Sequence, residues 1–200
     1  MGDFAFLIPA SILMVSMTLT PGPNNVMLTA SGANFGFRRT IPHILGILGG
    51  CFVLFAAIGL GLGSVFERYP SAQRSLGALG SAYLLYLAWR IASAAPPSQT
   101  AGKRSQPLKF WEAAAFQFAN PKAWIMGSAL MSGFLPPEGD PRVNAFLLAT
   151  ASEVIALPCI SLWAAFGTAI GKLLASDGSW RKFNRCMGCL TAVSVVTIWL

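Results

Sequence analysis

The chain has 200 residues, of which 54% are hydrophobic and only 10% are charged. A soluble domain carries about 25% charged residues, and a chain this short cannot bury so much apolar surface in one core. These values favour a membrane protein over a soluble one. The net charge of +7 comes from basic residues that lie between the apolar segments, as the topology of a membrane protein requires, so we expect no nucleic-acid partner.

Long uncharged stretches predict an all-α protein with six transmembrane helices. The predicted spans cover residues 4–33, 41–66, 71–93, 110–135, 143–171 and 184–200. We therefore expect one transmembrane domain over residues 1–200, made of a first three-helix half (1–93), a linker (94–109) and a second three-helix half (110–200).

Lysine and arginine are concentrated in alternate connections between the predicted spans. Three lie in or at the edges of the connections after the second and fourth spans, namely Arg68, Arg74 and Arg142. Ten lie in or at the edges of the connections after the first, third and fifth spans, namely Arg38, Arg39, Arg90, Lys103, Arg104, Lys109, Lys172, Arg181, Lys182 and Arg185. Basic residues accumulate on the cytoplasmic side of membrane proteins. The linker is therefore predicted to be cytoplasmic, and both termini are predicted to be non-cytoplasmic.

The first predicted span is too long to be one straight helix. Its uncharged stretch runs over residues 4–37, which would be about 50 Å long as a helix, whereas the hydrocarbon core is about 30 Å thick. We predict a break within it, at the run Thr20, Pro21, Gly22, Pro23, Asn24 and Asn25.

The residue types at this break expose backbone groups. Proline lacks an N–H and clashes with the carbonyl four residues earlier, so Pro21 frees the carbonyl of Met17. Gly22 adds backbone freedom, and the two asparagines that follow offer amides for capping or for a ligand. A break inside lipid needs protein or a wet cavity beside it. The alternative is a kink packed against neighbouring helices.

The second span carries His43 near its start and several glycines, among them Gly46 and Gly49. We interpret His43 as a helix-end residue rather than a proton relay, and the glycines as positions of close helix packing. One histidine does not support a conventional zinc site, and the chain has no P-loop or hydrolase motif. We therefore expect no enzymatic activity and no cofactor.

The fourth span contains a second predicted break, at Asn120, Pro121 and Lys122. Pro121 frees the carbonyl of Gln117. Lys122 is a charge within an apolar segment; it either extends to the membrane interface or faces the interior as a ligand or gating contact.

The two breaks lie half a chain apart, with Pro21 and Pro121 separated by 100 residues. Three spans per half make the second half enter the membrane from the opposite side, which is the pattern of inverted repeats with a central binding site. A helix N-terminus after each break could hold a carboxylate. The freed carbonyls could hold an ammonium group or a proton-bearing water.

Glu153 is the only acid deep within an apolar segment. It could neutralise a substrate ammonium group, pair with Lys122 or carry a proton; the alternative is a satisfied structural acid or one nearer an interface. Cys186 and Cys189 form a CxxC pattern, which allows a redox role, although no second cysteine pair accompanies it.

The run Thr20-Pro21-Gly22-Pro23-Asn24 resembles the corresponding motif of the LysE/RhtB family of lysine and homoserine/threonine exporters. The run Asn120-Pro121-Lys122-Ala123 also resembles a motif of that family, and the resemblance covers nearly the whole chain. It implies a bacterial inner-membrane exporter of amino acids or related metabolites, driven by the proton gradient. It also implies that the substrate path is framed by Pro21, Pro23, Asn24, Asn120, Pro121 and Lys122. Glu153 is a candidate through its position alone.

The sequence thus predicts a polytopic membrane protein with two inverted three-helix repeats and proline-broken first and fourth helices. Its expected partners are a small zwitterionic substrate, the lipid bilayer and protons as coupling ion, and a homo-oligomer is left open. The alternatives are a cation or metal exporter, a membrane thiol-electron carrier and a structural scaffold. A metal exporter requires clustered acids, histidines or thiols, and only Glu153 fits that pattern.

Overall fold

A computed structural model describes residues 7–96 and 106–199 of the chain. Within these residues the secondary structure is entirely helical. The first half contains α1 (Leu7–Leu19), α2 (Pro23–Phe35), α3 (Phe37–Ala57), the π-helical segment η2 (Ile58–Leu62), α4 (Gly63–Arg68) and α5 (Pro70–Ala92). The second half contains α6 (Phe110–Ala119), α7 (Pro121–Phe134), α8 (Pro141–Leu173), α9 (Asp177–Val193) and α10 (Val196–Trp199).

Prolines set the starts of four of these helices. Pro23, Pro70, Pro121 and Pro141 are the first residues of α2, α5, α7 and α8, the position where a missing N–H costs nothing and the fixed φ suits the helix. The two predicted breaks are confirmed, because α1 ends before Pro21 and α2 begins at Pro23, while α6 and α7 are separated at Asn120.

Two predicted boundaries were wrong. The last long helix begins at Asp177, about two turns before residue 184, because Ser176 accepts a hydrogen bond from the Ser179 N–H and so caps an earlier start. Its first turns are charged, which hid them from a search for apolar residues. The second predicted span begins at Phe37, directly after Gly36, whose φ of 78° reverses the chain without a longer connection.

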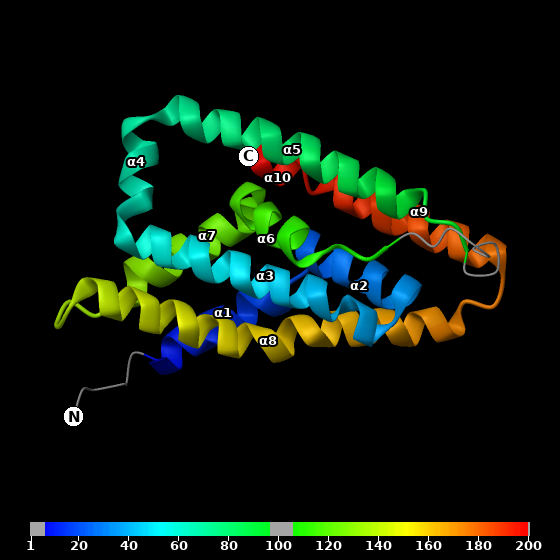
Figure 1. The fold of residues 1–200 in the computed structure, drawn as a ribbon, viewed down its shortest axis with the longest axis horizontal. Coiled ribbons are helices and arrows are strands. Elements are labelled where there is room, and N and C mark those ends of the chain that lie inside the picture. The colour runs from blue at the N-terminus through cyan, green and yellow to red at the C-terminus, as the bar shows by residue number, and fades with distance from the viewer. Residues whose placement is uncertain (1–6, 97–105, 200) are drawn as a thin grey trace.

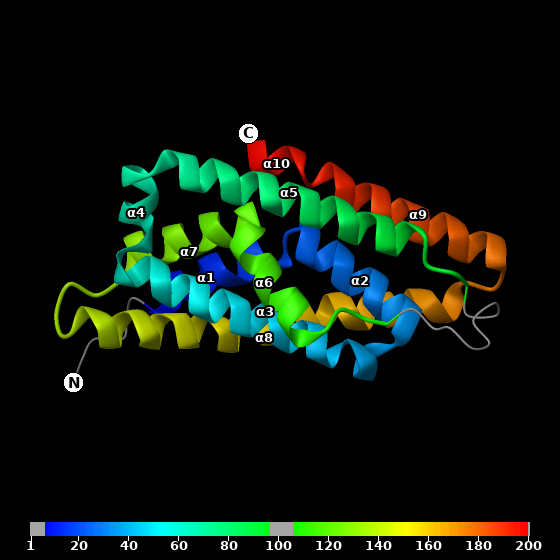
Figure 2. The ribbon, with the colours of Figure 1, turned by 45° about the horizontal axis from the view of Figure 1, so that its top comes forward.

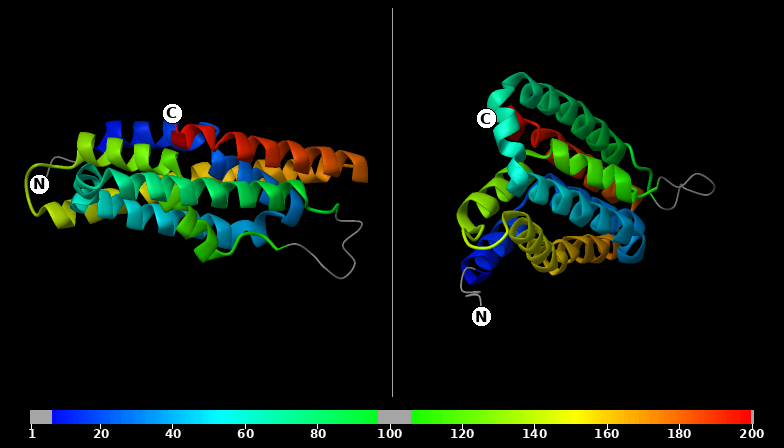
Figure 3. Two further views of the ribbon diagram at one scale, coloured as in Figure 1. Left: turned by 90° about the horizontal axis from the view of Figure 1, so that it is seen from above. Right: turned by 60° about the vertical axis from the view of Figure 1, so that its left-hand side comes forward.

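Most helices run along the long axis of the molecule (Figure 1). Along one edge α5 packs against α9, and along the other α8 packs against α1, α2 and α3. Helices α6 and α7 lie between these two groups, as the turned view shows (Figure 2). Seen from above the molecule is elongated, whereas the view turned toward one end is more compact (Figure 3).

Glycines allow the closest of these helix contacts. A side chain at Gly46 of α3 would collide with the carbonyl oxygen of Phe110 on α6, and one at Gly167 of α8 would collide with that of Thr29 on α2. The backbones therefore touch where side chains would keep them apart. This confirms the packing role predicted for Gly46 and Gly49 of the second span. The same prediction is wrong for Gly61 and Gly63, where an added Cβ would meet no helix from elsewhere in the described chain within 4 Å.

The outer surface carries many large apolar side chains. Exposed examples occur on most helices and include Leu79, Trp89, Leu147, Val154 and Leu173. Over the described part of the chain, two helices are long and apolar enough to cross a membrane, Phe37–Leu62 and Pro141–Leu173, and α1 is a shorter apolar helix. An apolar exterior of this kind suits a lipid environment.

Candidate functional site

The two helix breaks meet in space. The Lys122 ammonium, at the start of α7, donates to the Thr20 carbonyl at 2.6 Å, to the Thr20 hydroxyl at 3.2 Å and to the Pro21 carbonyl at 3.5 Å. Gly22 makes room for this approach, because a Cβ there would lie 2.9 Å from the Cδ of Lys122. The lysine thus faces the interior break instead of extending to an interface.

The end of α1 at the first break is closed by two side chains. The Thr20 hydroxyl donates to the Met17 carbonyl at 2.7 Å, which is the group that Pro21 deprives of its helical partner. The buried Asn25 amide donates to the carbonyls of Thr18 and Thr20, both at 2.8 Å. Asn25 therefore holds the break in place. On the other side of the break, α2 starts after Gly22 with no side-chain cap, which leaves the partial positive charge of its N-terminus without a capping group.

The second break is held by Asn120, which is 2% exposed. Its side-chain oxygen accepts from the Lys122 N–H at 3.1 Å and so caps α7. Its own N–H donates to the Gln117 carbonyl at 3.2 Å, which satisfies the group that Pro121 displaces. The break is thus stable inside an apolar helix bundle, while Lys122 remains available for contacts across it.

A cluster of amides joins the two breaks. Asn24 Nδ2 donates to Gln117 Oε1 at 2.8 Å, and Gln117 Nε2 donates back to Asn24 Oδ1 at 3.2 Å. The same Gln117 oxygen accepts from Asn120 Nδ2 at 3.3 Å and from the Cys51 thiol at 3.5 Å. Sequence reasoning missed the Gln117 side chain, although a glutamine in an apolar run, three residues before Asn120, was a usable signal.

A cavity of about 40 Å³ opens between the two breaks. This exceeds the 10–15 Å³ that one water requires. The predicted site residues that line it are Gly22, Pro23, Asn24, Asn25, Asn120, Lys122 and Glu153. Thr20 and Pro21 do not line the cavity themselves, but their carbonyls bond to Lys122, which does. Pro121 is also not among the lining residues.

Glu153 and Lys122 line the same cavity but do not pair. Among the described residues no ion pair joins them; the carboxylate instead accepts from the Ser152 hydroxyl at 3.4 Å. The predicted alternative of a direct Glu153–Lys122 pair is therefore absent. One acidic and one basic group remain on a common cavity, each held by neutral partners.

The rest of the cavity wall is apolar and sulfur-rich. Met14, Met17, Met126 and Cys51 contribute to it, and methionine side chains adapt their shape to different contacts. The buried Thr18 hydroxyl also belongs to a lining residue, and its oxygen has no hydrogen-bond partner within the described chain. These residues were not predicted, because their type alone does not distinguish a cavity wall from a packed core.

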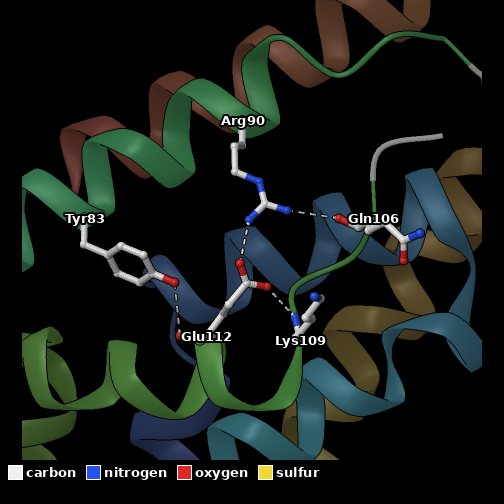
Figure 4. A network of polar contacts seen from close by, with 5 residues as sticks. All are labelled: Tyr83, Arg90, Gln106, Lys109 and Glu112. Atoms are coloured by element: carbon white, nitrogen blue, oxygen red, sulfur yellow. Dashed lines mark hydrogen bonds and ion pairs between the residues drawn. The ribbon is translucent and has the colours of Figure 1, made fainter. Parts of the chain in front are cut away.

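A separate polar network ties α5 to the start of α6 (Figure 4). Arg90 Nη1 and Glu112 Oε1 form an ion pair at 3.0 Å, and Arg90 Nη2 donates to the Gln106 carbonyl at 3.3 Å. Glu112 also accepts from the Lys109 N–H at 2.8 Å, and the Glu112 carbonyl accepts from the Tyr83 hydroxyl at 3.3 Å. The network fixes Arg90 beside a second cavity.

The alternative functions, thiol-electron transfer and metal export, depend on cysteines and on clusters of metal ligands. Cys186 and Cys189 are exposed free thiols on α9. Over residues 7–96 and 106–199, no three side chains of His, Cys, Asp or Glu group in a way that could hold a metal ion.

Comparison with known proteins identifies similar chains. The model of the LysE type translocator family matches residues 15–198. The cysteine/O-acetylserine efflux proteins of Escherichia coli (strain K12) and Shigella sonnei (strain Ss046) are each 34% identical over 121 residues. That match covers 60% of this chain and 60% of each relative. No solved structure matches significantly.

Proposed function

The chain belongs to the LysE type translocator family, and on that premise we propose that it exports small amino acids or related zwitterionic metabolites. As a translocator it is a membrane protein and not an enzyme. The matched relatives are named for efflux of cysteine and O-acetylserine, which makes small amino acids of this size the first candidates. We propose the bacterial inner membrane as its location and the proton gradient as its energy source.

The observation that carries this proposal is the meeting of two broken helices at a cavity that bears both charges. A zwitterion has a carboxylate and an ammonium group. The carboxylate would bind Lys122 and the positive N-terminal end of α2, and the ammonium group would bind Glu153. Neither charged side chain is neutralised by an ion pair with the other, so each retains attraction for a guest.

The apolar part of the cavity wall would contact the side chain of the substrate. Met14, Met17 and Met126 can reshape around small groups of different form. A short thiol or acetyl ester would contact this surface, while the polar residues orient the zwitterion. This division of roles is typical of small-molecule sites.

We further propose six spans arranged as two inverted three-helix halves, with both termini non-cytoplasmic. The contact between the breaks supports this arrangement, because interrupted helices of inverted repeats share one central site. Relative motion of the halves would then open the cavity to either side in turn.

Glu153 offers a route to proton coupling. One carboxylate can bind a substrate ammonium group or a proton, but not both at full strength. If protonation displaces the substrate on the outer side and deprotonation on the inner side restores binding, one proton enters for each zwitterion exported. Among the described residues, Glu153 is the only acidic one that lines the cavity, so the exchange is assigned to this residue.

The test is efflux of labelled O-acetylserine from proteoliposomes under an imposed proton gradient. Glu153→Gln keeps the size of the side chain and removes its charge, and we expect proton-driven efflux to fall at least about tenfold, as loss of 1.4 kcal/mol of transition-state binding would produce. Glu138→Gln makes the same chemical change at an exposed position and should transport normally. Undiminished coupled efflux by Glu153→Gln would remove Glu153 from the mechanism.

A further inference from the structure

A second cavity, of about 60 Å³, lies between α2, α3, α5 and residues 106–108. Its polar lining residues are Ser31, Asn34, His43, Arg90 and Gln106. None of them was assigned to the substrate path by sequence. The cavity is separate from the one at the helix breaks, because no residue lines both.

His43 is the unusual feature of this cavity. The side chain is 1% exposed, and neither ring nitrogen has a hydrogen-bond partner in the described part of the chain. A neutral imidazole offers one donor and one acceptor, and burying both without partners costs about 1–3 kcal/mol for each group. Unpartnered polar atoms of this kind require an explanation.

The positions of the unpartnered atoms indicate what could satisfy them. Among the described residues, the buried side-chain atoms without a partner are the Thr18 hydroxyl and the two His43 nitrogens. Thr18 lines the first cavity and His43 lines the second. Both cavities therefore present unused hydrogen-bonding capacity at their walls, which a polar guest would satisfy.

Arg90 supplies a positively charged group on the same cavity. Its guanidinium is oriented by Glu112 and by the Gln106 carbonyl (Figure 4), and these two contacts leave further N–H groups of its fork for a ligand. Asn34, another lining residue, exchanges hydrogen bonds with Asn184 at 2.8 and 3.2 Å. The walls are thus fixed before a guest arrives, which lowers the cost of binding.

The two cavities follow one another along the same two helices. On α2, Asn24 lines the first cavity and Met27 the second; on α3, Ile47 lines the first and His43 the second. These steps of three and four residues correspond to about 4.5 and 6 Å along a helix, so the two cavities are successive rather than remote. The second lies toward the linker end of the molecule, where the basic connections predict the cytoplasmic side.

We propose that the second cavity is a separate binding site for the exported class of solute, reached before the site at the helix breaks. The ligand is a small zwitterionic amino acid. Its carboxylate binds Arg90, and its ammonium group donates to one nitrogen of the neutral His43 ring, whose other nitrogen is left to a water or to a polar side chain of the solute. This inference rests on the proposed function, because it assigns the same solute to both cavities.

Equilibrium binding of radiolabelled O-acetylserine to the purified full-length protein tests the proposal. We expect two solutes per wild-type chain, one per chain for His43→Leu, and one for Lys122→Met, which alters only the first cavity. His43→Gln retains a donor and an acceptor and should bind the second solute more strongly than His43→Leu does. Ile44→Val, a conservative change at the next buried position of α3, should bind as the wild type does.

Thermal unfolding separates a binding role from a structural one. His43→Leu removes two unpartnered polar atoms, so without solute its Tm should equal or exceed that of the wild type, while the solute-induced rise in Tm should shrink. A ratio of one solute per chain in both wild type and His43→Leu, abolished by Lys122→Met, would overturn the second site and leave the proposed function standing. Absence of all binding to the wild type would overturn both.

Discussion

At the scale of single residues, Lys122 connects the two halves of the chain. Its ammonium group bonds to the Thr20 and Pro21 carbonyls, which a proline break leaves without a following helical N–H. The sequence predicted that Lys122 faces either the interior or an interface, and the structure decides for the interior. The partners themselves could not be predicted, because they depend on how two distant breaks pack together.

Lys122→Met keeps the length of the side chain and removes its charge. A hydrogen bond to a charged group contributes about 1.5–3 kcal/mol, but the carboxylate displaces the carbonyl partners that Lys122 already has. Only part of that energy is therefore lost, and the KM for zwitterionic amino acids should rise by about tenfold. Initial rates of efflux from proteoliposomes at graded internal concentrations measure this. Lys172→Met, at an exposed position near the end of α8, is the control. A KM that stays at the wild-type value would show that Lys122 does not bind the carboxylate.

The reciprocal amide pair of Asn24 and Gln117 should be energetically coupled. Asn24→Leu or Gln117→Leu alone leaves a buried amide short of a partner, at a cost of about 1–3 kcal/mol. Replacing both removes the amide that each single change leaves behind, while the Asn120 and Cys51 donors lose their acceptor equally in both Gln117 variants. The double variant should therefore lose less stability than the sum of the two single losses. Chemical unfolding in detergent gives the four free energies of the cycle. Strict additivity would contradict a direct bond.

At the scale of elements, the breaks were predictable because proline acts through local covalent geometry. The start of α9 was missed because its first turns carry Asp177, Arg181 and Lys182, so apolar periodicity begins too late to mark it. The π-helical segment η2 was also missed. It depends on Gly61, whose φ of 101° lies in the left-handed region, and one glycine among several in that stretch carries no distinguishing signal.

Gly61 and Gly63 provide a matched pair for testing this turn. Gly61→Ala forces a side chain into a left-handed conformation and should destabilise the protein by about 1–2 kcal/mol. Gly63 has a helical φ of −56°, and a Cβ added there would have no neighbouring atom within 4 Å. Gly63→Ala should therefore be neutral or stabilising by up to about 1 kcal/mol. Unfolding midpoints in detergent distinguish the two; equal midpoints would refute the role of Gly61.

At the scale of the whole molecule, the sequence predicted that two distant breaks form one site, and the structure brings them together around one cavity. The sequence did not predict the second cavity, because in the sequence His43 is only a histidine near the start of a helix. Its burial without partners results from the packing of α2, α3 and α5. Orientation in the membrane rests on the distribution of basic residues, which labelling can test.

In a background with Cys186→Ser and Cys189→Ser, where the remaining Cys51 and Cys159 are buried, one added cysteine can report which side each connection faces. Glu138→Cys lies between α7 and α8, and Ala175→Cys lies between α8 and α9, both at exposed positions. A membrane-impermeant maleimide should label Glu138→Cys in intact cells and Ala175→Cys only after lysis. The reverse pattern would invert the proposed topology. Normal efflux in this background would also exclude an essential role for the two thiols.

The bonds between Lys122 and the carbonyls of Thr20 and Pro21 have a consequence for turnover. When no cargo is present, the ammonium group already has oxygen partners, so a carboxylate that replaces them gains only the difference between two similar interactions. Net affinity stays modest although each individual bond is strong. A carrier built in this way selects its cargo by chemical type and still releases it quickly on the far side of the membrane.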